Sequence, residues 1–178
     1  MRTATVVLAA YCLCVVVAAL WRLAPWVGDA IPDLGALTAA YLGLTARRQI
    51  APAIGGAIVL GYLIDLISGS PPGLIALVLG LTTLVARAVQ QRILVRGAVI
   101  SIAFSSFVAV FAGVTAYLVR ALYQVPTAAF GLELRHLIGV TIATAVFGSL
   151  VWRMFRRIDA AFARTHRERD AALEGLAP

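Results

Sequence analysis

Residues 61–77 read GYLIDLISGSPPGLIAL and contain much of the information about how this chain folds. They comprise the end of one apolar segment, a polar turn of Ser, Gly and Pro residues, and the start of a second apolar segment. A single carboxylate, Asp65, lies just before the turn. Because an ionisable group inside such a run is costly and usually faces other helices or water, we expect Asp65 to be a structural or functional anchor.

The composition is that of an integral membrane protein. Of the 178 residues, 62% are hydrophobic and 13% are charged, whereas soluble domains are nearer half apolar and a quarter charged. This length leaves room for about six spans of roughly 20 residues each. We therefore predict an all-α integral membrane protein, with a six-transmembrane-helix bundle over residues 1–154 and a cytoplasmic C-terminal tail over residues 155–178.

Six apolar segments are predicted to span the membrane: residues 5–20, 32–45, 50–67, 72–89, 97–118 and 137–152. A loop is expected over residues 122–134. The second segment would rise only about 21 Å as a helix, against a hydrocarbon core of about 30 Å. It must therefore be sheltered by its neighbours or begin below the interface. Pro32 suits the first residue of that helix, and Asp33 suits its N-terminus.

The first segment follows a basic residue, Arg2, so it also fits a signal peptide. No convincing cleavage site precedes Trp21, and the chain returns to the membrane at once, so we predict a span. The prolines that open the fourth segment are expected to occupy the first turn of its helix.

In the second, third, fifth and sixth segments, small residues recur at intervals of four, which places them along one face of the helix. Such stripes let helix backbones approach closely and predict a compact bundle. The candidate helix-packing or partner interface comprises Ala53, Ala57, Gly61, Ser101, Ser105 and Gly113. Further small residues are Gly35, Ala39 and Gly43 in the second segment and Thr141, Ala145 and Ser149 in the sixth.

The net charge of +7 comes from fifteen arginines, no lysine and eight acids. The arginines form short patches between apolar segments, which indicates topology signals rather than nucleic-acid binding. Three fall on one side of a six-span arrangement: Arg22, Arg120 and Arg135. Twelve fall on the other: Arg2, Arg47, Arg48, Arg87, Arg92, Arg96, Arg153, Arg156, Arg157, Arg164, Arg167 and Arg169. This asymmetry predicts that both termini are cytoplasmic and that the turn after Asp65 faces outward.

After Trp152, basic residues alternate with apolar ones and predict a basic amphipathic helix on the membrane surface. Its cytoplasmic basic surface is expected to include Arg153, Arg156, Arg157 and Arg164. A topology anchor on anionic lipid and a docking site for a cytoplasmic protein both stay open as interpretations, whereas nucleic acid is disfavoured.

Asp65, with Ser68 and Ser70, has three interpretations. The carboxylate could accept amide hydrogen bonds from the following turn as a local cap, contact a partner helix, or handle an ion or proton. A lone acid is a weak sign of transport, because proton-coupled carriers usually have more than one buried ionisable group.

Catalytic and metal-binding patterns are lacking in the sequence. His136 and His166 are predicted on opposite sides of the bilayer, and His136 lies about 20 Å from Ser149 along one helix, too far for a catalytic dyad. Cys12 and Cys14 point in different directions on a helix. There is no P-loop, GxGxxG or HExxH motif. We expect no enzymatic activity, cofactor or metal.

The motif DLISGSPPGL at residues 65–74, together with the start of the short second segment, resembles the bacterial rod shape-determining protein MreD family. The residues that carry the resemblance are Pro32, Asp33, Gly61, Asp65, Ser68, Gly69, Ser70, Pro71 and Gly73. In length, span number and orientation the resemblance covers the whole chain. Pro72 adds a second proline to the turn, a departure that makes the turn stiffer.

The resemblance implies a non-enzymatic scaffold of the cell-elongation machinery in the bacterial cytoplasmic membrane. Such proteins are thought to bind the bitopic protein MreC and, through it, to connect cytoplasmic MreB filaments with peptidoglycan synthases. The family's fold is similar to the S-components of energy-coupling-factor transporters. Its members have no established catalytic residues, so none is expected here.

The main alternative is a small-molecule-binding subunit of an S-component-type transporter. It would need an outward cavity with convergent polar groups. The sequence offers few candidates for such a lining beyond Ser101, Ser105, Ser106, Thr115 and Thr141. These side chains also suffice for helix packing. An intramembrane enzyme is disfavoured because acid–base pairs are missing.

Overall fold

The protein is an all-α, multi-pass membrane bundle, as the sequence predicts. The structure, a computed structural model, describes residues 2–23, 30–46, 49–92, 98–125 and 129–174, and within these ranges the chain forms six helices and no strand. The helices are α1 (Arg2–Leu23), α2 (Leu34–Thr45), α3 (Ala51–Ser68), α4 (Leu74–Arg92), α5 (Ala98–Leu122) and α6 (Phe130–Glu174). Five of them, all except α2, are long and apolar enough to cross a membrane.

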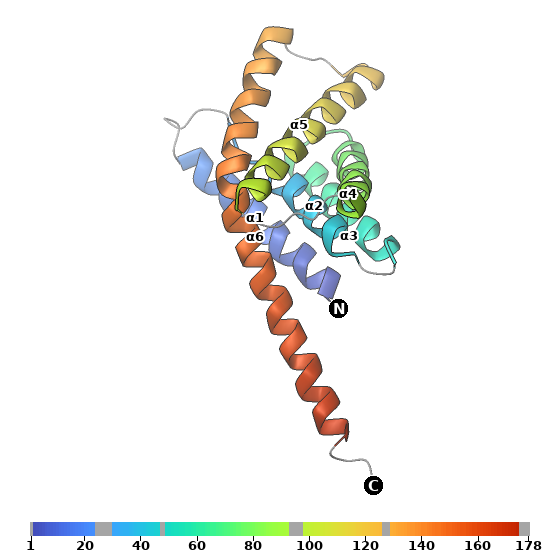
Figure 1. Cartoon of the computed structure of the whole chain (residues 1–178). Coiled ribbons are helices and arrows are strands. Elements are labelled where there is room, and N and C mark those ends of the chain that lie inside the picture. The colour runs from blue at the N-terminus through green and yellow to red at the C-terminus, as the bar shows by residue number, and fades with distance from the viewer. Residues whose placement is uncertain (1, 24–29, 47–48, 93–97, 126–128, 175–178) are drawn as a thin grey trace.

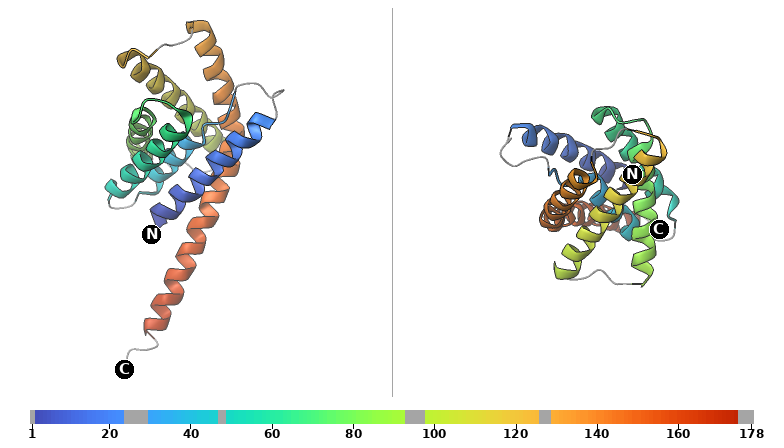
Figure 2. Two further views of the ribbon diagram at one scale, coloured as in Figure 1. Left: turned by 180° about the vertical axis from the view of Figure 1, so that it is seen from behind. Right: turned by 90° about the horizontal axis from the view of Figure 1, so that it is seen from above.

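The two ends of the bundle differ in shape. The N-terminus and the long descending part of α6 lie at one end, which we call the terminal end (Figure 1). At the opposite end, α5 and α6 diverge from each other (Figures 1 and 2). We call this the turn end, because the turn between α3 and α4 lies there. The start of α1 and the end of α6 therefore lie toward the same end, as a chain that passes through the bundle six times requires.

The short helix α2 forms the centre of the bundle. Its twelve residues rise roughly 18 Å, well short of a hydrocarbon core of about 30 Å. Every residue from Leu34 to Gly43 is buried, and all five other helices contact α2. The prediction that neighbouring helices shelter this segment is confirmed.

Helices α3 and α4 make a close backbone contact at the turn end. A Cβ atom added to Gly61 would lie 2.5 Å from the Cα of Ala76 and 2.6 Å from its backbone nitrogen. Ala53 and Ala57 are buried on the same face of α3. This stripe of small residues therefore packs inside the bundle, against α4 at Gly61.

Two further contacts between helices depend on small residues. Gly43 of α2 lies directly against the backbone of Thr83 on α4, and the Thr83 hydroxyl donates to the carbonyl of Ala39 at 3.2 Å. Between α5 and α6, a Cβ on Gly148 would lie 2.8 Å from the Cβ of Ser105. Close backbone packing of this kind replaces the hydrophobic driving force that lipid does not supply between helices.

Aromatic side chains close the terminal end of the core. Tyr41 of α2 lies with its ring centroid 6.2 Å from that of Trp152 and 5.1 Å from that of Phe155, both on α6. Phe104 of α5 meets Trp152 edge-on at 5.7 Å. These rings join α2, α5 and α6 into one packed layer.

Two predicted boundaries near the turn end were wrong. Helix α4 begins at Leu74, so Pro71 and Pro72 belong to the turn and not to the first turn of the helix. Gly73, with a φ of 97°, is not helical and separates the prolines from α4. Helix α6 begins at Phe130, inside the loop expected over residues 122–134.

The predicted boundary between residues 154 and 155 is not a break in the structure. Helix α6 continues through it to Glu174, and its 45 residues extend roughly 68 Å, more than twice the hydrocarbon thickness. The sequence has neither Gly nor Pro between residues 149 and 174, so nothing interrupts the helix. The C-terminal part therefore projects beyond the bundle instead of folding back as a separate helix (Figure 1).

We predict that Gly61→Ala lowers the free energy of unfolding by about 1–3 kcal/mol, because the new methyl group must displace the backbone of Ala76. Unfolding of the purified protein in detergent measures this change. The matched control is Gly55→Ala on the same helix, where nothing lies within 4 Å of the added carbon; this variant should be at least as stable as the parent, since Ala favours a helix. Equal stability of the two variants would contradict the packing argument.

Candidate functional site

The Asp65 carboxylate caps the N-terminus of α4. Asp65 is 1% exposed, and its two oxygens accept hydrogen bonds from the Ser70 hydroxyl at 2.5 Å, the Gly73 amide at 3.0 Å, the Ile75 amide at 3.0 and 3.1 Å, and the Ala76 amide at 3.3 Å. Amides in the first turn of a helix have no partner within it. Of the three interpretations of Asp65, the structure supports the cap.

The rest of the motif shapes the chain so that Asp65 can reach these amides. Gly69 ends α3 in the left-handed conformation, with a φ of 68°, and its amide donates to the Asp65 carbonyl at 3.1 Å. Ser68 donates to the carbonyl of Ile64 at 2.9 Å and lies 3.0 Å from the Ser70 hydroxyl. Each polar side chain of the turn is therefore engaged within the turn.

Asp33, which follows Pro32, caps the N-terminus of the central helix α2. One oxygen of Asp33 accepts from the Ala36 amide at 2.8 Å, and the Asp33 amide donates to the Thr144 hydroxyl on α6 at 2.9 Å. Pro32 is buried just before the helix. Thr144, fully buried, was not singled out from the sequence, because its role depends on a residue 111 positions away.

At the terminal end, α2 is also held by side chains from its neighbours. The Tyr41 hydroxyl donates to Asp159 of α6 at 2.5 Å, and the guanidinium of Arg87 on α4 donates to the carbonyl of Ala46, the residue that caps α2. Neither contact could be found from local spacing, since the partners lie 118 and 41 residues apart.

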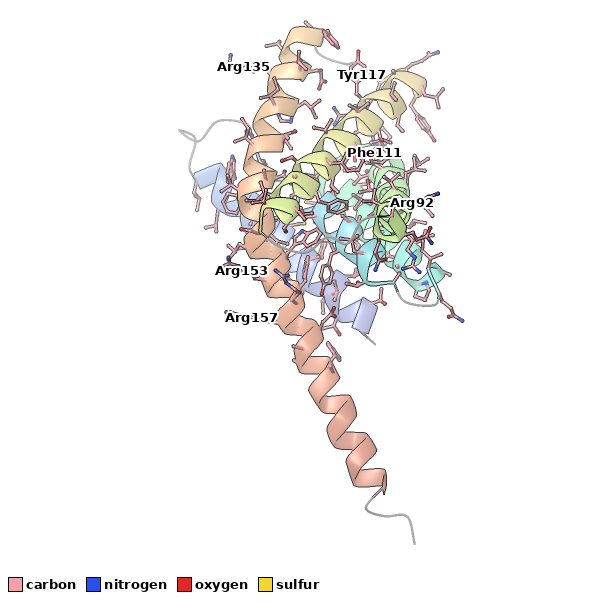
Figure 3. The ribbon with its side chains drawn as sticks, in the orientation of Figure 1. Arg92, Phe111, Tyr117, Arg135, Arg153 and Arg157 are labelled. Carbon is pink, nitrogen blue, oxygen red and sulfur yellow. The ribbon has the colours of Figure 1, made fainter. Side chains whose placement is uncertain are left out.

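The basic surface begins where α6 leaves the bundle. Arg153, Arg156 and Arg157 are exposed, whereas Phe155 between them is fully buried. Figure 3 shows Arg153 and Arg157 directed away from the other helices. The Arg164 side chain lies outside the described residues.

The small residues predicted on α5 have different surroundings. Ser105 is fully buried and donates to the carbonyl of Ser101 at 2.9 Å. The Ser101 hydroxyl is buried and has no hydrogen-bond partner among the described residues. Gly113 lies against the side chain of Leu137 on α6.

A cavity of about 450 Å³ opens at the turn end between the diverging helices α5 and α6 and the ends of α2, α3 and α4. Its wall is mainly aliphatic, and its polar side chains are Asp33, Tyr117, Arg120, Glu133 and His136. None of the expected lining residues Ser101, Ser105, Ser106, Thr115 and Thr141 contributes to it. These candidates for the lining of an outward cavity therefore lie elsewhere on α5 and α6.

Two charged residues of the cavity could have been linked from the sequence. Arg120 and Glu133 have opposite charges, flank the same short connection and lie 3.8 Å apart in the structure. From the sequence, Arg120 was interpreted as a topology signal and Glu133 was placed in a loop, because the N-terminal turns of α6 were not recognised as helical.

Among the described residues, no three His, Cys, Asp or Glu side chains come together as metal ligands. Cys12 is exposed and Cys14 is partly buried, and both are free thiols. Comparisons with protein-family models, with curated proteins and with solved structures found no match. The assignment of a function therefore depends on the geometry of this chain and on the resemblance of its turn motif.

We predict that Asp65→Asn lowers the free energy of unfolding by about 2 kcal/mol, because a neutral amide replaces a charged acceptor of several backbone N–H groups. The matched control is Ser106→Ala, which removes a hydroxyl bonded only to the carbonyl of Ile102 on its own helix and should cost less than about 0.5 kcal/mol. Both are measured by unfolding in detergent. An unchanged stability of Asp65→Asn, or a parent stability that rises specifically with sodium, would contradict the cap.

Proposed function

We propose that this chain is a non-enzymatic scaffold of the bacterial cell-elongation machinery, of the MreD type. It lies in the cytoplasmic membrane with both termini in the cytoplasm. It binds the bitopic protein MreC and thereby links MreB filaments to the synthases that build peptidoglycan outside the membrane.

The hydrogen bonding of the buried Asp65 carboxylate is the observation that carries this proposal. Both oxygens of Asp65 are occupied by a hydroxyl and by backbone amides. A carrier needs a buried ionisable group that is available to its ion or proton, and an enzyme needs an acid or base within reach of a substrate. A carboxylate that holds two helices together serves assembly, which is also what the resemblance of the motif implies.

The distribution of charge supports the same orientation. The exposed Arg153, Arg156 and Arg157 lie at the terminal end, where the N-terminus also lies. Arginine is enriched on the cytoplasmic side of membrane proteins. The projecting part of α6 then extends into the cytoplasm, on the side of the filaments.

One observation favours a second candidate function. The cavity at the turn end faces outward in this orientation, and its volume of about 450 Å³ falls within the range of small-molecule sites. A small-molecule-binding subunit of S-component type would have such a site. Its largely aliphatic wall offers few groups to orient a water-soluble substrate, so we rank this function second.

The test is depletion of the protein in its native bacterium, followed by microscopy and by assays of nutrient uptake. The scaffold function predicts that cells lose their rod shape and become round, and that expression of the parent protein restores rods. The Gly55→Ala variant should restore them equally, whereas Asp65→Asn should restore them less completely at equal membrane abundance.

Unaltered rods after depletion would refute the scaffold function. If uptake of a nutrient were impaired in the same cells, the transporter function would take its place. Co-purification of MreC with the parent protein provides a second, independent measurement of the proposed partner.

A further inference from the structure

The cavity at the turn end is polar at its mouth and, apart from Asp33, aliphatic along the rest of its length. Tyr117 and Arg120 come from the last two turns of α5, and Glu133 and His136 come from the first two turns of α6. The remaining wall includes Leu79, Leu137 and Val140. A site divided in this way matches an amphiphile, with a polar head at the mouth and a hydrocarbon chain below it.

The depth of the cavity agrees with this division. Ala112 and Gly113 line it eight and seven residues before Arg120, and Val140 lines it seven residues after Glu133. At 1.5 Å per residue, the aliphatic part reaches about 10–12 Å beyond the charged groups. The charged groups lie at helix ends, where the polar headgroups of a bilayer meet its hydrocarbon.

The open edge of the cavity is apolar. Val114, Phe130 and Leu134 line it and are 43%, 69% and 44% exposed. An entrance to water would be expected to carry polar side chains, whereas an entrance from the bilayer needs apolar ones. The edge therefore admits a hydrocarbon chain from the side, between the diverging helices seen in Figure 1.

The mouth offers one charge of each sign. The Arg120 guanidinium and the Glu133 carboxylate are 3.8 Å apart, beyond the 2.7–2.9 Å that is typical of a charge-assisted hydrogen bond. The pair can therefore take up further partners. Tyr117 lies near the outer end of α5, whereas Arg135 of α6 points away from α5 (Figure 3). The fifth polar side chain of the cavity, Asp33, lies deeper, beside Thr144 of α6, and one of its oxygens accepts from the Ala36 amide.

We infer that this cavity binds one phospholipid whose head carries both a phosphate and a primary ammonium group, as in phosphatidylethanolamine. Arg120 and His136, which both line the cavity, bind the phosphate; Glu133 accepts from the ammonium group; one acyl chain fills the aliphatic part. This lipid site is independent of the proposed scaffold function, because neither Asp65 nor the basic surface contributes to it.

The test is native mass spectrometry of the delipidated full chain, titrated with dioleoyl phosphatidylethanolamine. We expect one saturable adduct. Dioleoyl phosphatidylglycerol, which lacks the ammonium group, should bind roughly tenfold or more weakly, the loss expected of a charge-assisted hydrogen bond. Glycerophosphoethanolamine, which has the head but no chains, should not compete.

Two pairs of variants make the test specific. Ala116→Phe fills the cavity from α5 and should abolish the saturable adduct, whereas Ala103→Phe, on an exposed part of the same helix, should not. Arg120→Gln should weaken binding roughly tenfold or more, whereas Arg135→Gln, outside the cavity, should leave it unchanged. Leu134→Trp narrows the cavity from its exposed edge and replaces Ala116→Phe if that variant does not fold.

Three results would overturn the inference. If Ala116→Phe and Leu134→Trp both kept the adduct at parental affinity, the bound lipid would be annular. If phosphatidylglycerol bound as tightly as phosphatidylethanolamine, the pairing of Glu133 with an ammonium group would be wrong. Competition by glycerophosphoethanolamine alone would indicate a water-soluble ligand. The melting temperature of each variant without added lipid shows whether its fold is intact.

Discussion

The hydrogen bonds between the Asp65 carboxylate and the first amides of α4 are the constraint on which the rest of the bundle depends. Backbone N–H groups within a bilayer cannot donate hydrogen bonds to water, so a helix that begins there needs an acceptor from the protein itself. Gly61 lies one turn before Asp65, and its missing side chain brings the Ala76 backbone close to α3. Because the Ala76 amide donates to Asp65, the glycine and the carboxylate act on the same contact.

The pair α3–α4 in turn provides part of the shell around α2. A helix of twelve residues cannot reach both surfaces of a bilayer, so its two ends must be satisfied by protein. Asp33 caps its first turn and bonds to Thr144, while Tyr41 and Ala46 near its other end bond to Asp159 and Arg87. The central helix is thus fixed by hydrogen bonds to α4 and α6 as well as by burial.

The two ends of the bundle are suited to different tasks. The terminal end is closed by Tyr41, Phe104, Trp152 and Phe155, and it continues into the projecting, basic part of α6. The turn end is open, with an aliphatic cavity and an ion pair at its mouth. A scaffold that meets a cytoplasmic partner at one end and accommodates a lipid at the other would make use of both.

Composition and local spacing were enough to predict a helical membrane bundle, the burial of the short second segment, and the proximity of Asp65 to the turn that it caps. These features depend on residues close together in the chain, where helical periodicity and the desolvation cost of a charge act directly. The start of α6 and its unbroken course past Phe155 were missed, because helix ends were placed where the composition changes, whereas a helix can continue from an apolar into a basic stretch that has neither Gly nor Pro. The cavity required the tertiary structure: it exists because α5 and α6 diverge, and helix angles are set by contacts between residues far apart in the sequence.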